Sequence, residues 1–225
     1  MAKPHPRSLL VEGKEDKLVI PQFMEKFIAW GEWNEPHKWP VLIKDFDGIE
    51  PLLKPGTIEA ELKSPGLKAL GVMVDADSDP ASRFRGIRDR VVKTFPTIPM
   101  ELPADGLIMV NADGLRFGVW LMPNCTSQGM LETFLSLFVD NSTSNLWSVV
   151  KTHCREAKDQ HNAPYKEAHR DKSQIHAWLA LQDPPGQQLH SAIIQNILVP
   201  NSPQAAPFVN WFCKLYEVSR VGSDL

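Results

Sequence analysis

The sequence is poor in cysteine and has no closely spaced cysteine pair. Its 225 residues include three cysteines, Cys125, Cys154 and Cys213. An odd number at wide spacing argues against a disulfide framework and is typical of reduced thiols. The first residues contain no apolar stretch of signal-peptide length, and no apolar run approaches the length of a membrane span. We therefore expect a soluble, cytoplasmic protein without a membrane partner.

A strong excess of charge and the common nucleotide-binding loops are also missing. The net charge is −3, so any contact with nucleic acid must come from a local patch and not from bulk charge. Neither a Gly-x-Gly-x-x-Gly motif nor a Walker-type loop is present, so we do not expect the chain to bind ATP itself. The histidines and the cysteine between residues 153 and 169 fit no standard zinc-binding spacing.

The hydrophobic residues, 43% of the chain, alternate between strand and helix patterns. Strands are predicted at 8–11, 41–46, 67–74, 107–111 and 116–122. Helices are predicted at 16–30, 81–95 and 130–139, and at 48–62 with a break near Pro55-Gly56. This order predicts an α/β, Rossmann-like fold with a mostly parallel sheet flanked by helices and a hairpin at Asp113-Gly114. From residue 142 the pattern becomes helical. We expect an α/β core over 1–141 and a helical extension over 142–225 that packs on the same domain.

Two acidic turns each follow an apolar strand. Glu12 comes directly after the strand at 8–11, and Asp75 and Asp77 come after the strand at 67–74. Because the carboxyl ends of parallel strands meet at one edge of a sheet, we expect these carboxylates to lie close together. Carboxylate oxygens are suited to Mg²⁺ or Mn²⁺. The sequence therefore predicts a divalent-metal site at this edge.

These motifs resemble the TOPRIM domain of topoisomerases, DnaG-type primases and nucleases of the overcoming-lysogenization-defect (OLD) family. More closely, the chain is similar to a family of short stand-alone TOPRIM-like bacterial proteins of uncharacterised function. The resemblance covers most of the chain and lies in VEGKED at 11–16, VDAD at 74–77, LMPN at 121–124 and GMLE at 129–132. It implies that Glu12 is a metal ligand or general acid/base, and that Asp75 and Asp77 are metal ligands.

The same resemblance implies roles for three further residues. Asp16 and Glu132 would complete a second metal site, and Lys172 would stabilise charge at the scissile phosphate. Each also has a purely structural interpretation, which stays open. Asp16 can cap the first helix, Glu132 suits the first turn of its helix, and Lys172 can be a solvated lysine. For Asp79, which precedes Pro80, helix capping is the favoured interpretation.

Two basic segments lie at 83–93 and 151–172. The first is best explained as a solvated helix face, although it could hold phosphates near the metal. The second could steer a nucleic acid or form a mobile solvated loop, and the sequence does not decide between them.

We expect a Mg²⁺- or Mn²⁺-dependent nuclease that acts on DNA or RNA. OLD-type nucleases work with an ATPase, so a separate ATPase partner is a reasonable hypothesis, and assembly with a second copy of the chain is also open. The alternative is a non-catalytic TOPRIM-fold module that uses its acidic edge for a structural ion or a protein partner. Nucleotidyl transfer of the primase type ranks last, because no zinc-binding or polymerase elements are evident.

Overall fold

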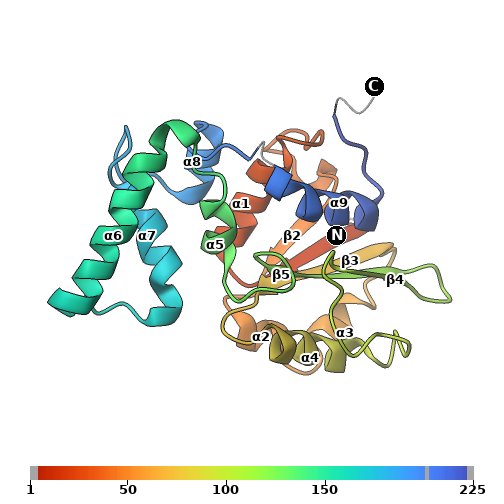
Figure 1. Cartoon of the computed structure of the whole chain (residues 1–225). Helices are drawn as coiled ribbons and strands as arrows, with labels where there is room; N and C mark the ends of the chain where they lie inside the picture. The colour runs from red at the N-terminus through yellow and green to blue at the C-terminus, as the bar shows by residue number, and fades with distance from the viewer. Residues whose placement is uncertain (1–4, 201–202, 222–225) are drawn as a thin grey trace.

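The computed structural model describes residues 5–200 and 203–221, which form a five-stranded sheet flanked by helices (Figure 1). The strands are β1 (Arg7–Val11), β2 (Leu42–Asp45), β3 (Ala69–Asp75), β4 (Leu107–Val110) and β5 (Arg116–Met122). Their order is β2-β1-β3-β5-β4, with parallel pairing throughout except between β4 and β5. This confirms the predicted α/β, mostly parallel architecture and the hairpin.

One face of the sheet is covered by three helices that follow β2 and β3 in the chain. They are α2 (Ile49–Leu53), α3 (Thr57–Glu61) and α4 (Pro80–Val91). Alternate residues of the strands, such as Leu10 and Val72, pack here against Phe84 and Ile87 of α4. All are buried because a central parallel strand is covered on both faces.

The opposite face holds the larger, aromatic core. It is covered by α1 (Lys14–Met24), α5 (Leu131–Ser136) and α9 (Ala206–Tyr216), and α8 (Leu189–Ile194) packs against α1. The ring of Phe208 packs against Trp120 and Phe134, and the indole N–H of Trp211 donates to the Leu107 carbonyl at 3.0 Å. The chain after residue 142 therefore contributes to the same hydrophobic core as the sheet.

Two further helices, α6 (Ser144–His161) and α7 (Arg170–Leu179), lie side by side beyond α5 (Figure 1). The mobile-loop interpretation of the basic segment is wrong for residues 151–161, because they form most of α6. Val150, Ile175 and Trp178 are buried and join this pair to the main core. Short 3₁₀ helices occur at η1 (Pro36–Lys38), η2 (Asn141–Thr143), η3 (Glu167–His169) and η4 (Pro203–Ala205).

The first helix is shorter than predicted. It ends at Met24, and Pro21 lies inside it. Beyond Met24 the backbone continues in turns, with the Phe27 N–H donating to the Met24 carbonyl at 2.9 Å. Trp30 is still buried, but it reaches the core through contacts with Trp39 and Phe212. The apolar spacing identified the buried residues but predicted too long a helix, because turns can bury side chains at similar intervals.

In the described ranges 5–200 and 203–221, none of the helices combines the length and the apolar character needed to cross a membrane.

The helix α9 lies directly on a pair of glycines in the sheet. Gly71 and Gly118 are register partners on β3 and β5. A Cβ atom at Gly71 would be 2.3 Å from the Tyr216 hydroxyl oxygen, and one at Gly118 would be 2.7 Å from a methyl carbon of Leu215. The missing side chains thus allow α9 to approach closely, and the Tyr216 hydroxyl donates to the Ser8 carbonyl at 2.9 Å.

We predict that Gly118→Ala destabilises the fold by about 1–3 kcal/mol, because the added methyl overpacks the contact with Leu215. Urea denaturation measures the effect. The matched control is Gly86→Ala on α4, where the nearest atom is the flexible end of Leu53 at 3.0 Å. In a helix alanine is favoured over glycine by about 0.5–1 kcal/mol, and this gain should offset the crowding at position 86. The same loss of stability in both variants would contradict this account of α9.

Candidate metal centre

The site begins where two neighbouring strands end. Because β1 and β3 pair in parallel, the residues after Val11 and Met73 emerge at the same edge of the sheet. Glu12 accepts a hydrogen bond from the Asp75 backbone N–H through Oε1 at 2.9 Å. The structure thus brings the two predicted acidic turns together, and the contact is made by the Glu12 side chain itself.

Asp16 lies one helical turn beyond Glu12, at the start of α1. Its Oδ2 accepts from the Gly13 N–H at 3.0 Å, which satisfies one of the free donors at the helix start. The side chain is buried beside the carboxylates of Glu12 and Glu132, whose charges act on it. The capping interpretation is therefore confirmed, and the same carboxyl also belongs to an acidic cluster made of Glu12, Asp16, Asp75 and Glu132.

Glu132 reaches the cluster through α5. The Leu131 N–H donates to Asp75 Oδ1 at 2.8 Å and attaches the beginning of α5 to the end of β3. Glu132 follows in the first turn of α5 and is 3% exposed. A carboxylate is favoured in a first helical turn, but almost complete burial there needs a further reason.

Asp77 occupies a different position from Asp75. Its backbone is left-handed (φ 49°) and exchanges two hydrogen bonds of 2.9 Å with Gly129. The side chain forms an ion pair with Arg83 of α4 and is 43% exposed, at the rim of the cluster. Asp79 accepts from the Ser82 N–H at 2.9 Å and caps α4, as predicted.

Lys172 lies opposite this edge on α7. Its ammonium is 2.6 Å from Oε1 of Glu132 and 3.3 Å from Oε2 of Glu15. Burial alone would lower the pKa of Lys172, but the two carboxylates outweigh it and raise the pKa above its usual value. Lys172 is thus paired and not simply solvated, and its partner is the buried Glu132.

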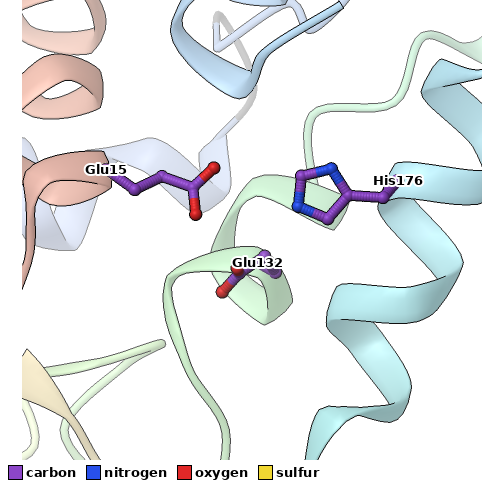
Figure 2. A group of neighbouring side chains, drawn as sticks. All are labelled: Glu15, Glu132 and His176. Carbon is purple, nitrogen blue, oxygen red and sulfur yellow. The ribbon is translucent and has the colours of Figure 1, made fainter. Parts of the chain in front are cut away.

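Two residues at the site were not included in the sequence prediction. Glu15, Glu132 and His176 point toward one another from α1, α5 and α7 (Figure 2), and one potential ligand atom of each lies within 4.8 Å of the others. Glu15 directly precedes Asp16 in the first acidic turn. His176 is four residues after Lys172, one helical turn along the same face. The sequence shows this four-residue spacing, which predicts that Lys172 and His176 lie on the same face of a helix. It does not predict which other helices that face contacts.

Burial and mutual repulsion disturb the ionisation of the cluster. Burial raises the pKa of Asp75 well above its ordinary value, and the neighbouring charges of Asp16, Glu12 and Glu132 raise it further. Burial also raises the pKa of Asp16 to about 7 and, less strongly, that of Glu12, although the Asp75 N–H opposes the shift at Glu12. The metal-free site therefore retains protons that isolated carboxyl groups would lose.

These carboxylates provide the ligand chemistry of a hard cation. Mg²⁺ and Mn²⁺ prefer oxygen ligands, and a cation among Glu12, Asp16, Asp75 and Glu132 would offset their repulsion. Asp77 could join them if Arg83 released it. The donor set thus fits a divalent ion.

Three clefts are linked by shared lining residues, and Asp77 at the rim of the cluster lines two of them. A central cleft of about 480 Å³ is lined in part by Asp77, Ser78 and Arg170. An Arg83 cleft of about 390 Å³ shares Asp77 and Ser78 with it, and an α6–α7 cleft of about 290 Å³ shares Arg170 and also includes Lys151 and Arg155. Cationic side chains therefore stand at both ends of a path whose middle is acidic.

Residues 6–217 match a family model described as "Protein of unknown function (DUF3226)". The match spans most of the chain, so the protein belongs to the DUF3226 family. No curated protein and no solved structure matches the chain. The family description names no activity, and the resemblance to TOPRIM enzymes stays a prediction.

The raised pKa values make stability depend on pH. Unfolded Asp16 should ionise near its ordinary pKa of 3.8, whereas folded Asp16 retains its proton up to about pH 7. Between these values the folded state binds more protons, so the free energy of unfolding falls as pH rises. Asp75 is shifted in the same direction and adds to the loss.

We predict that Asp16→Asn stabilises the metal-free protein at pH 8 and changes little at pH 4. Asparagine still accepts the Gly13 hydrogen bond but carries no charge, and a gain of up to about 4 kcal/mol follows because one pKa unit corresponds to about 1.4 kcal/mol. Urea denaturation in EDTA at both pH values measures it, with the exposed Asp89→Asn of α4 as control. Equal stability of Asp16→Asn and wild type at pH 8 would contradict the prediction.

Proposed function

We propose that this protein is a divalent-metal-dependent phosphodiester enzyme with a TOPRIM-like site, acting as a nuclease on DNA or RNA. The observation that carries the proposal is the convergence of Glu12, Asp16, Asp75 and Glu132, mostly buried, at the carboxyl edge of β1 and β3. Desolvated carboxylates repel one another and cost stability, so a merely structural site has little reason to collect four of them. A divalent cation would supply the missing charge.

Each residue of the proposed site has a role that follows from its position. Glu12 and Asp75 would hold the ion together with Asp77, and Asp16 and Glu132 would hold a second one. A bound Mg²⁺ or Mn²⁺ would act as a Lewis acid and lower the pKa of a coordinated water. Burial raises the pKa of Glu12, which makes its carboxylate a better proton acceptor than an exposed one.

The clefts support a polyanionic substrate. Arg83 on one side, and Arg170 with Lys151 and Arg155 on the other, can contact phosphates on both sides of the acidic centre. Lys172, next to the cluster, would stabilise charge at the phosphate under attack. This local arrangement would also explain how a chain of net charge −3 could bind nucleic acid.

A non-catalytic module is the second candidate. Arg83 already pairs with Asp77, and Lys172 already pairs with Glu132. Both carboxylates thus have counterions from the protein, which would suit a site that holds its shape without chemistry. Binding of a metal ion that displaces neither pair and supports no cleavage would favour this candidate.

A separate ATPase partner and a cytoplasmic location belong to the proposal. The sequence has no Walker-type loop, so any ATP-driven step would need another protein. Affinity purification of the tagged chain at its natural expression level tests this, and recovery without any ATPase would count against the partner.

We predict Mn²⁺- or Mg²⁺-dependent cleavage of plasmid, single-stranded DNA or RNA that falls on the order of 10³-fold in Asp75→Asn, since a catalytic metal contributes several kcal/mol. Asparagine preserves the acceptor for the Leu131 N–H. Initial rates on labelled substrates measure the loss, with Asp89→Asn as the matched control. Thermal unfolding in EDTA establishes that Asp75→Asn is folded.

Cleavage that survives in Asp75→Asn would assign the activity to another site or a contaminant. Absence of cleavage by the wild type on every substrate, with a bound metal, would favour the non-catalytic module.

We predict that Lys151→Ala/Arg155→Ala weakens substrate binding and leaves the chemical step intact. KM should rise and kcat should stay within about twofold, while the slope of log affinity against log salt should fall by about 1–2. Fluorescence anisotropy across a salt series and steady-state rates measure these quantities. Lys63→Ala is the control, because Lys63 is exposed near the start of β3, at the opposite end of the strands. Equal affinities for the two variants would exclude the α6–α7 cleft from the substrate path.

A further inference from the structure

A group of side chains that includes a histidine lies next to the acidic cluster, and the proposed function gives no role to two of its members, Glu15 and His176. Glu15, Glu132 and His176 come from three different helices and converge (Figure 2), with ligand atoms within 4.8 Å of one another. Such a set offers two carboxylates and one imidazole. Transition-metal ions, Mn²⁺ among them, accept imidazole nitrogen in addition to oxygen ligands, whereas Mg²⁺ takes oxygen ligands and water.

A cation already lies at this group. The Lys172 ammonium is 2.6 Å from Glu132 and 3.3 Å from Glu15, and Lys172 and His176 share one face of α7. Apart from this ion pair, no described residue donates a hydrogen bond to Oε1 of Glu132, which is fully buried. Glu132 thus presents a desolvated oxygen toward a position that the folded protein fills with positive charge.

Lys172 can leave that position. Its side chain is 46% exposed and ends a flexible four-carbon stem, so the ammonium can move into solvent or toward the neighbouring cleft. The carboxylate of Glu132 cannot follow, because it is held in the core with α5. Departure of Lys172 therefore leaves Glu15, Glu132 and His176 around an uncompensated buried charge.

We propose that Glu15, Glu132 and His176 form a transition-metal site at which Lys172 is the built-in competitor. The ammonium neutralises Glu132 in the metal-free protein, and Mn²⁺ or a similar ion displaces it. The inference rests on the proposed function, because it adds Glu15 and His176 to the second metal site of Asp16 and Glu132 and makes that site selective for Mn²⁺ over Mg²⁺. Displacement of Lys172 also frees its ammonium for a phosphate in the central cleft.

Calorimetric titration of the purified full chain with Mn²⁺ and with Mg²⁺ tests the site directly. We expect two Mn²⁺ binding steps and one Mg²⁺ step in the wild type. His176→Ala should remove the step that is specific to Mn²⁺, and Asp75→Asn should remove the step common to both ions. Lys172→Met should strengthen the Mn²⁺-specific step on the order of tenfold, a typical size for coupling between neighbouring sites. The matched control His153→Ala, on the exposed face of α6, should change neither step.

Two Mn²⁺ steps in His176→Ala, or unchanged or weaker binding in Lys172→Met, would overturn the proposal. If only these fail while Asp75→Asn removes the common step, the proposed function survives and the transition-metal site does not. If His176→Ala removes the Mn²⁺-specific step and Asp75→Asn changes neither step, the transition-metal site survives and the proposed function does not. Pulsed EPR of the Mn²⁺-loaded wild type should show ¹⁴N coupling, and its absence would overturn the proposal even if His176→Ala failed to fold.

Discussion

The removal of carboxylates from water is the constraint on which the candidate site depends. Asp16 and Asp75 are surrounded by protein, and their charged forms are disfavoured by burial and by the neighbouring carboxylates, whereas the buried Glu132 is paired with the Lys172 ammonium. Protons, the Lys172 ammonium or a metal ion can balance these carboxylates. The chemistry of the site is then a competition among these three kinds of positive charge.

The fold keeps these groups together through contacts on both faces of the sheet. On one face α9 lies close over Gly71 and Gly118, and on the other α4 packs its apolar side against β3. The strands that lead into Glu12 and Asp75 are therefore packed on both faces. The bond from the Leu131 N–H to Asp75 then adds α5, so Glu132 is positioned by the same strand that carries Asp75.

Internal counterions explain how such a site can exist without a metal. Arg83 pairs with Asp77 at the rim, and Lys172 pairs with Glu132 in the interior. Both cations come from long side chains that can move, whereas the Glu132 carboxylate is held in the core with α5. In the proposed enzyme, the same two cations become available to phosphates when metal ions take their places.

The sequence by itself determined the strands that lead into Glu12 and Asp75, the hairpin and the cap at Asp79, because these depend on patterns within a few residues. It also indicated that Asp16 and Glu132 suit helix starts. The tertiary structure alone decided that Asp77 pairs with Arg83, that residues 151–161 of the basic segment lie in α6, and that His176 faces Glu15 and Glu132. Lys172 and Glu15 are 157 residues apart, and Leu131 and Asp75 are 56 apart. Contacts at such separations are set by helix packing on the sheet, which no local pattern records.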